Sequence, residues 1–252
     1  MADPEENTSE EEGSHEEAEM TFLDHLEELR WRIIYSLIGI VVGTIIAWIF
    51  IDFFIDHVLL IPAKVSGFKL QNLRPFGQLM LYFEVALIIG LIISFPNLVY
   101  HLWKFISPAL KSNEKKWIKS IVLFTTVCFL CGVVFAYFIM LPFTLKFAAG
   151  FGSASISNNF SIDEYFSIIM SIILGAGLIF ELPMLSFFLS KIGILSPNLM
   201  KKYRRHAIVV IMVLAAVLSP GTDPVSQIVL AIPLVFLYEI SILVSKFFYK
   251  KS

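Results

Sequence analysis

The sequence has few of the residues on which enzyme sites are usually built. It contains two cysteines and five histidines among 252 residues, and charged residues make up only 16% of it. No glycine-rich loop follows a strand, and no group of histidines and cysteines has the spacing of metal ligands. Serine, histidine and aspartate are too scattered to suggest a protease triad. We therefore expect no enzyme activity, catalytic residue, cofactor, metal site or nucleic-acid partner.

Basic residues are missing from the start of the chain. Residues 1–19 hold no lysine or arginine but nine acids, Asp3 and eight glutamates. This is the reverse of the basic start of a cleavable signal peptide. Such a run cannot bury apolar surface, so we expect residues 1–20 to form a disordered acidic tail. Residues 20–252 hold 19 bases and 12 acids, a net charge of +7.

Apolar residues, by contrast, are abundant. Hydrophobic residues make up 57% of the chain, 24 residues are phenylalanine, and the mean hydropathy is +0.79. A helix needs about 20 apolar residues to cross a hydrocarbon core of about 30 Å. The uncharged stretches predict an all-α integral membrane protein with six transmembrane helices, near residues 33–51, 78–102, 120–142, 165–190, 207–219 and 225–244.

The distribution of basic residues predicts the orientation. With the N-terminus in the cytoplasm, fifteen lysines and arginines fall on the cytoplasmic side and four on the other. That is a clear positive-inside bias. Both termini are then cytoplasmic, which requires an even number of spans. The four bases on the opposite side are Lys64, Lys69, Arg74 and Lys146.

The fifth and sixth predicted spans are separated only by the stretch SPGTDP, residues 219–224. A proline, glycine and aspartate cluster is a turn signal. It leaves about thirteen residues for the fifth span, which needs a locally thinned bilayer. One long tilted span with an external C-terminus is the alternative, and we favour the hairpin. Pro96, Pro183 and Pro233 should bend their helices and favour a curved bundle.

Cys128 and Cys131 have the spacing of a dithiol motif, in the sequence CFLC. They lie inside the third predicted span with no base nearby to lower a thiol pKa. A membrane thiol oxidoreductase would place its cysteines near the outer surface. We therefore interpret both as small packing residues.

Three acids lie inside the predicted spans, namely Glu84, Glu181 and Glu239. An ionised group at a helix centre costs about 2.5–3.5 kcal/mol on insertion scales, so such groups usually face a cavity or a partner. The alternative is a protonated glutamate that bonds to a neighbouring helix. For Glu181, next to Pro183, we favour a water-filled cavity.

Several stretches of the sequence are similar to one family. They are FLDHLEELRWR before the first span, FPNLVYHLWKFISPAL at 95–110, FAYFIMLPF at 135–143, IFELP at 179–183 and DPVSQIVLAIPLVFLYEIS at 223–241. In this order and spacing the chain resembles TatC, the multispanning receptor subunit of the twin-arginine protein translocase. The resemblance covers about residues 21–248, which we take as the six-span domain. It implies six helices, the last two short.

The resemblance also implies a function. Proteins of this family bind the Arg-Arg motif of signal peptides on the cytoplasmic face of the bacterial inner membrane. They then assemble with single-span subunits of the TatA/TatB type to export folded proteins, driven by the protonmotive force. Self-association is a further expectation.

Candidate signal-peptide residues follow from the same resemblance. They are Glu28 and Glu114, with Arg30 and Arg32 beside them. A carboxylate matches the planar fork of arginine with two parallel hydrogen bonds, which lysine cannot reproduce. The plainer interpretations are that Glu28 pairs with Arg32 at i, i+4 and that Glu114 stabilises a helix N-terminus. Candidate intramembrane contacts to partner subunits are Glu181, Glu239, Gln227 and Asp223.

Two points limit the resemblance. Glu84 stands where relatives often carry a lysine, so we assign it no role. The rival function is a proton-coupled small-solute transporter with Glu181 as the coupling carboxylate. That rival predicts inverted repeats, and the two halves of the sequence show no self-similarity.

Overall fold

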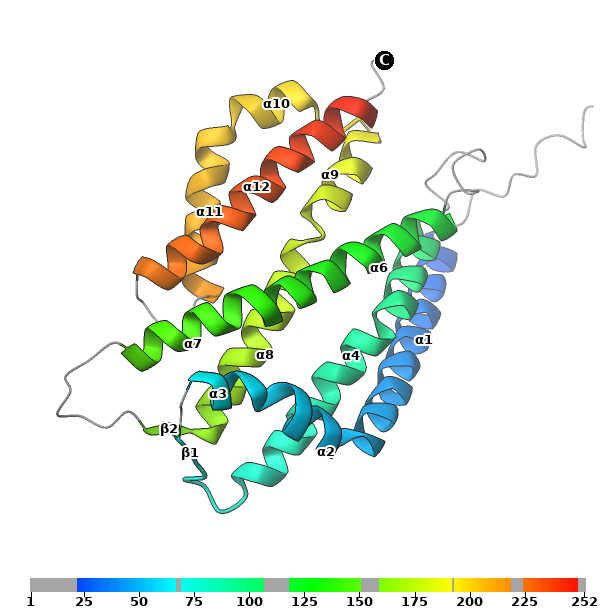
Figure 1. Cartoon of the computed structure of the whole chain (residues 1–252). Coiled ribbons are helices and arrows are strands. Elements are labelled where there is room, and N and C mark those ends of the chain that lie inside the picture. The colour runs from blue at the N-terminus through cyan, green and yellow to red at the C-terminus, as the bar shows by residue number, and fades with distance from the viewer. Residues whose placement is uncertain are drawn as a thin grey trace, which may run out of the picture.

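The computed structural model describes residues 22–66, 69–106, 118–150, 159–191, 193–218 and 224–248. Helices account for nearly all of these residues (Figure 1). The first two long helices are α1 (Phe22–Ile49) and α4 (Gly77–Ile106), which pack side by side. Between them lie α2 (Ile51–Phe54), the π-helix η1 (Ile55–Leu59), α3 (Ile61–Ser66) and the strand β1 (Lys69–Gln71).

The third membrane crossing is a nearly continuous helix. It consists of α6 (Ile118–Phe135), the π-helix η3 (Ala136–Met140) and α7 (Leu141–Gly150). The strand β2 (Asn159–Ser161) then pairs in parallel with β1, with Leu70 opposite Phe160. This short pairing ties the segment before α4 to the segment before the next long helix.

The fourth crossing is broken in the middle. It runs as α8 (Ile162–Ile179) and α9 (Leu182–Lys191), separated by Phe180 and Glu181. Pro183 lacks the N–H that would continue the helical ladder, so the predicted bend at this proline is confirmed. Pro96 and Pro233 lie inside α4 and α12 without ending them.

The last two crossings form an antiparallel hairpin after the short α10 (Pro197–Lys202). They are α11 (Arg204–Leu218) and α12 (Pro224–Phe248). Met212 contacts Gln227, and Arg204 contacts Glu239, so the pairing runs in opposite directions. The predicted hairpin is confirmed in preference to one long helix, although residues 219–223 lie outside the described part of the chain.

Length separates these two helices. With 15 residues, α11 spans about 22 Å at 1.5 Å per residue, short of the hydrocarbon thickness. With 25 residues, α12 spans about 37 Å, longer than the predicted 225–244. The expectation of two short helices therefore holds for α11 only. Five helical segments of the described chain are long and apolar enough to cross a membrane, and α11 is a sixth, shorter one.

The helices do not form a closed cylinder. Figure 1 shows α1 and α4 on one side of α6, and α9, α11 and α12 on the other, so the bundle is splayed and curved as expected. The outward face of α1 carries large apolar side chains, several of them more than half exposed, which suits contact with lipid. These include Leu37, Ile38, Val41 and Ile45.

Close packing holds the pieces together. A Cβ atom added at Gly43 of α1 would lie 2.5 Å from the Gly90 carbonyl oxygen of α4, so only glycine permits this approach. In α6, the Phe129 ring stacks on Phe95 of α4 at 3.6 Å between centroids. Below we call the end of the bundle with α2, η1, α3 and the two strands the cap side. The opposite end, where α1 begins and α12 ends, is the termini side.

Candidate functional site

The candidate signal-peptide residues lie at the termini side, on the first turns of α1. Glu28 and Arg32 are one helical turn apart and form an ion pair, with 2.7 Å between Arg32 Nη2 and Glu28 Oε1. Arg32 Nε donates a second hydrogen bond, of 3.3 Å, to the same oxygen. The plainer interpretation of Glu28, a pair with Arg32, therefore holds in this conformation.

Only one oxygen of Glu28 takes part in this pair. Its other oxygen, Oε2, is buried and has no hydrogen-bond partner among the described residues. Both side chains of the pair are 18% exposed, so Glu28 is largely screened from water. An unpaired carboxylate oxygen is an unused acceptor, and the desolvation cost of leaving it unpaired favours any donor that can reach it.

Aromatic contacts fix the surroundings of this pair between α1 and α4. The imidazole of His25 stacks on Phe105 at 4.4 Å, one turn before Glu28. Tyr35 stacks on His101 at 5.5 Å, two turns after Glu28 and one turn after Arg32. The nitrogen Nδ1 of His101 is also buried without a partner in the described part of the chain. These stacks were not foreseen, although His25 and Tyr35 lie close to the helix entry motif.

The other candidates near this surface have different positions. Arg30 is exposed on α1, and so is Glu27. Glu114 falls in 107–117, outside the described residues, between the end of α4 at Ile106 and the start of α6 at Ile118. Glu28 therefore lies near the end of α4, where His25 stacks on Phe105, while Glu114 follows that end only in the sequence.

Glu181 occupies the break between α8 and α9. Its Oε1 is buried and has no hydrogen-bond partner among the described residues, while the backbone of Phe129 in α6 lies beside the carboxyl group. Packing is tight here, because a Cβ atom at Gly132 would lie 2.9 Å from Phe180 Cβ. The carboxyl group is thus held against α6 at the point where the fourth crossing bends.

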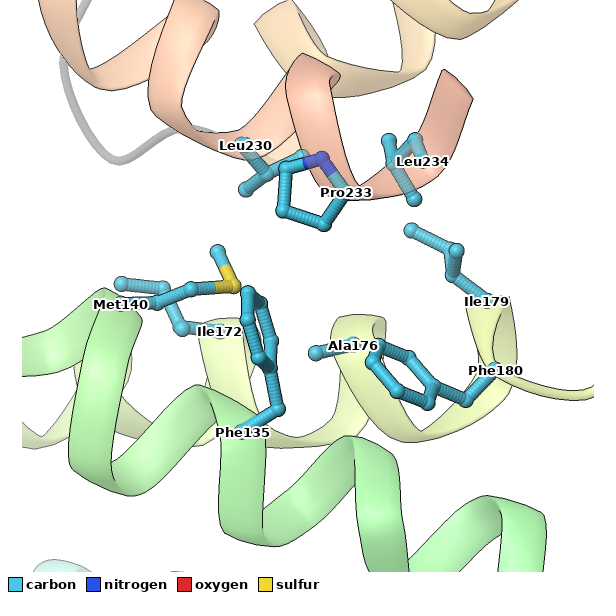
Figure 2. A pocket seen from close by; sticks show the side chains of 9 residues that line it. All are labelled: Phe135, Met140, Ile172, Ala176, Ile179, Phe180, Leu230, Pro233 and Leu234. Carbon is cyan, nitrogen blue, oxygen red and sulfur yellow. The ribbon is translucent and has the colours of Figure 1, made fainter. Parts of the chain in front are cut away.

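A small cavity lies beside the break between α8 and α9. Figure 2 shows it lined by apolar side chains from α6, η3, α8 and α12, including Ile179, Phe180 and Pro233. Its volume of about 10 Å³ holds one water molecule at most, and its lining offers no polar partners. Glu181 does not line it. This cavity is therefore a dry packing defect.

Glu239 and Gln227 connect α12 to α11. A guanidinium nitrogen of Arg204 lies 2.7 Å from Glu239 Oε2, and both side chains are about half exposed. Glu239 therefore has an ionic partner on the neighbouring helix α11. Gln227 Nε2 donates to the Met212 carbonyl at 2.9 Å. Asp223 lies outside the described residues.

The two cysteines lie on the middle of α6. Cys128 is half-buried, and Cys131 is exposed on an apolar helix surface. Within the described part of the chain no group of three or more His, Cys, Asp or Glu side chains could hold a metal ion.

The sequence analysis missed two tyrosines whose hydroxyl groups form hydrogen bonds with backbone groups on the cap side. Tyr165 of α8 donates from its hydroxyl to the Leu59 carbonyl at 2.7 Å and accepts from the Ala63 N–H at 3.0 Å. Its hydroxyl is thereby inserted between two groups that an α-helix would pair directly. Tyr137 donates to the Val58 carbonyl at 2.7 Å.

Proline explains the second of these bonds. Pro62 has no N–H, so the carbonyl four residues earlier, that of Val58, loses its helical donor. In a membrane an unpaired carbonyl is costly, and the Tyr137 hydroxyl takes the place of the missing donor. Pro62, in the sequence IPAK, was therefore the signal from which a side-chain donor to the Val58 carbonyl could have been predicted.

Comparison with known proteins agrees with this architecture. Residues 24–233 match the family model described as Sec-independent protein translocase protein (TatC). The chain is 36% identical over 237 residues to the TatC protein of Carboxydothermus hydrogenoformans, which covers 94% of this chain and 97% of the relative. It is 35% identical over 237 residues to that of Aquifex aeolicus, covering 92% and 98%.

A solved structure gives the same result. The crystal structure of a twin-arginine translocase receptor, TatC, superposes with a TM-score of 0.79 at 35% identity, covering 90% of this chain and all of that one. TatC proteins are translocase components without enzymatic activity, which agrees with the scarcity of catalytic residues in the sequence. With its helix order, its broken fourth crossing and these similarities, the chain belongs to the TatC family of Sec-independent protein translocase proteins.

Proposed function

We propose that this multi-pass membrane protein is a core component of the twin-arginine translocation system and that its termini side binds twin-arginine signal peptides. In this proposal the termini side faces the cytoplasm of a bacterium and the membrane is the inner membrane. Other Tat subunits, of the single-span TatA/TatB type, then join it to export folded proteins with the protonmotive force. The family argues against the alternative of a small-solute transporter.

The half-satisfied carboxylate of Glu28 is the observation that supports the binding site. Arg32 already shows that this carboxylate accepts a guanidinium at 2.7 Å. An incoming arginine can bond to Oε2 after a change of rotamer, or can replace Arg32 at Oε1. Glu114 supplies the second acceptor in this proposal, since it follows α4 at the same side. Two arginines in sequence would then meet two carboxylates.

The test compares binding of a signal peptide by variants of the full-length protein in membranes. Glu28→Arg and Glu114→Arg should each weaken binding by about 2–3 kcal/mol, near the lower end of what truncating one partner of a charged pair costs. Glu27→Arg is the matched control, since it changes the charge by the same amount at the exposed neighbour. Site-specific crosslinking from positions 28 and 114 to an Arg-Arg peptide, with a Lys-Lys peptide for comparison, measures the contact. Full binding by the double variant would remove the proposed role.

The orientation has its own test. Single cysteines at Ser14, Ser112 and Ser252 should be labelled only from the cytoplasmic side. Cysteines at Ser66, Ser155 and Thr222 should be labelled only from the outside. The positive-inside bias of fifteen against four supports this arrangement. Labelling of Ser252 from outside would require an odd number of spans and would contradict the proposal.

Glu181 is proposed to contact a polar segment of a partner helix during transport. Its Oε1 is buried without a hydrogen-bond partner among the described residues, at the bend of the fourth crossing. Glu181→Gln retains hydrogen bonding and should keep substantial export, whereas Glu181→Leu should insert normally but impair export or assembly. Export of a folded cargo by Glu181→Leu at the normal rate would show that the acid is only a tolerated polar residue.

A further inference from the structure

A groove near the termini side is bounded by three helices that the proposed signal-peptide site does not use. It lies between α6, α9 and α12 and has a volume of about 530 Å³. Its walls are apolar, formed by Ile121 and Phe124 of α6, Met184 and Phe187 of α9, and Val244 of α12. A space of this size is within the range of sites that hold small molecules.

The polar side chains of the groove lie at its termini-side end. Ser120 belongs to the first turn of α6, and Lys191 is the last residue of α9. The ammonium group of Lys191 lies 5.8 Å from the centre of the Phe187 ring, a cation–π contact with a side chain of the wall. None of the described residues that line the groove is an acid. The groove therefore combines apolar walls with a positively charged rim.

Each of the three helices carries a lysine at this rim. Lys119 precedes Ser120 on α6, and Lys246 follows Val244 by two residues on α12, and both lysines are exposed. Because Ser120, Lys191 and Val244 line one groove, the backbones of the three lysines lie at a similar level. Lysine side chains can also extend along apolar surface to bring their charge to an interface. An anion at the rim would be attracted by all three.

The volume of the groove indicates which apolar group fits. A helix with its side chains is about 10 Å across, so about 7 Å of its length, little more than one turn, would fill the space. A helical peptide would therefore lie mostly outside. An acyl chain is thinner and has no backbone polar groups that apolar walls would leave unpaired. It can enter from the surrounding lipid, because Phe124 in the wall is 52% exposed.

We propose that the groove holds one acyl chain of an anionic phospholipid, with the lipid phosphate at Lys191 and Ser120. The ammonium group donates charge-assisted hydrogen bonds to phosphate oxygens, and the serine hydroxyl adds a neutral one. Basic pockets between membrane helices recognise lipid head groups in the same way. The bound lipid would connect α6 to α9 and α12. This inference does not rest on the proposed signal-peptide site, because Glu28 lies on α1 and does not line the groove.

Photocrosslinking tests the occupant. The full-length protein, with p-benzoylphenylalanine in place of Phe124, is reconstituted in phosphatidylcholine vesicles that contain a minor fraction of phosphatidylglycerol. Lipid adducts at position 124 should be enriched in phosphatidylglycerol at least about threefold over the bulk, since the attraction of one lysine near a membrane surface amounts to about fivefold. The same label in place of Phe138, which is 68% exposed on η3, should report the bulk ratio. The bulk ratio at both positions would overturn the proposal.

A matched pair of lysine variants tests the rim. Lys191→Gln should return the adducts at position 124 to the bulk ratio. Lys104→Gln is the control, because Lys104 also lies in the last turn of its helix, with its ammonium group 5.7 Å from the centre of the Tyr100 ring, but does not line the groove. This variant should keep the enrichment. An equal loss in both variants would mean that general surface charge attracts the lipid, which contradicts a specific site.

Filling the groove tests whether the acyl chain enters it. Val244→Trp leaves Lys191 in place and should reduce lipid adducts at position 124 several-fold. Leu243→Trp, at a neighbouring residue that is 55% exposed and does not line the groove, should not. Binding of a signal peptide by each variant serves as the folding control. Unchanged adducts in Val244→Trp would contradict the proposal. Replacement of lipid adducts by peptide adducts when an Arg-Arg signal peptide is added would assign the groove to the peptide and overturn it.

Discussion

The two sides of the bundle are held together in different ways. On the cap side, hydrogen bonds connect residues far apart in the chain: Tyr165 reaches across 106 positions to Leu59, and Tyr137 reaches across 79 to Val58. On the termini side, the Glu28–Arg32 pair spans four positions. The longer-range bonds there lie within one group of helices each, Asn97 with Tyr35 between α4 and α1, and Ser190 with Ser245 between α9 and α12.

This difference indicates that the two sides have different structural roles. The cap side joins α3, α6–α7 and α8 by buried hydrogen bonds and a strand pair, so it holds the splayed bundle in one shape. On the termini side, α1 and α4 form one group and α9 to α12 another, and the two groups meet through apolar contacts such as Trp103 of α4 against Phe188 of α9, with 4.8 Å between ring centroids. A groove of about 530 Å³ lies between α6, α9 and α12 at this side, lined by Phe124, Met184 and Phe187. The termini side, where the two groups of helices meet through apolar contacts, is the one at which we propose that signal peptides bind.

The largest expected effect is at Tyr165, which is 2% exposed. Tyr165→Ala removes a buried ring and both hydrogen bonds, so we expect a loss of about 3–5 kcal/mol in unfolding free energy. Tyr165→Phe keeps the ring, and Leu59 and Ala63 can pair directly as in an ordinary helix, so it should cost only about 0.5–1.5 kcal/mol, the net value of a hydrogen bond. Unfolding in mixed detergent micelles measures both. Equal losses would mean that the hydroxyl, and not the ring, dominates.

The next effect tests the explanation from proline. Tyr137→Phe leaves the Val58 carbonyl without a donor, which should cost about 1–3 kcal/mol. In a Pro62→Ala background the backbone N–H at position 62 can bond to that carbonyl, so the same substitution should cost much less. A double-mutant cycle in micelles measures the coupling. If the cost of Tyr137→Phe is the same in both backgrounds, the carbonyl is not shared in this way.

A smaller effect is expected at the buried serine pair between α9 and α12. Ser190 Oγ donates to Ser245 Oγ at 2.6 Å, and both residues are fully buried. Ser190→Ala should cost about 1 kcal/mol, the net value of a typical hydrogen bond. The double variant Ser190→Ala, Ser245→Ala should cost less than the sum of the two single ones, because each loses the same bond. Strict additivity would show that the bond contributes nothing.

The smallest effect on stability is expected at the Glu28–Arg32 pair. Arg32→Gln should reduce the unfolding free energy by only about 0.2–0.5 kcal/mol, as for other i, i+4 ion pairs on helices. The same variant frees Glu28 and should change signal-peptide binding more than stability. A stability loss as large as that of Tyr137→Phe would erase the contrast between the two sides.

Much of this architecture could be predicted from the sequence, because hydrocarbon imposes simple demands on a chain. The uncharged stretches gave all six helical segments, and Pro183 gave the break in the fourth crossing. The hairpin after the fifth segment followed from its turn residues. The length of α12 was underestimated because the helix continues past the apolar run through Lys246 to Phe248. Side chains at a membrane interface allow such an extension.

The site was predictable only in part. The position of Glu28 one turn before Arg32 indicated the ion pair, but local spacing says nothing about which oxygen is left unpaired. The partner of Glu239 was missed because Arg204 is 35 positions away and its contact depends on how α11 packs on α12. The small dry cavity beside the break could not be predicted for the same reason: the apolar side chains that line it come from four separate elements.

By itself the sequence determined the class of protein, the number and order of the helices and the sign of the charge on each side. These properties follow from composition and from the cost of placing polar groups in lipid, which act on each segment independently. Only the tertiary structure decided which buried polar groups meet. The bonds from Tyr137 to Val58 and from Tyr165 to Leu59 and Ala63 require side chains on separate helices to reach specific carbonyl and N–H groups. Such distances are set by helix packing, which no single segment encodes.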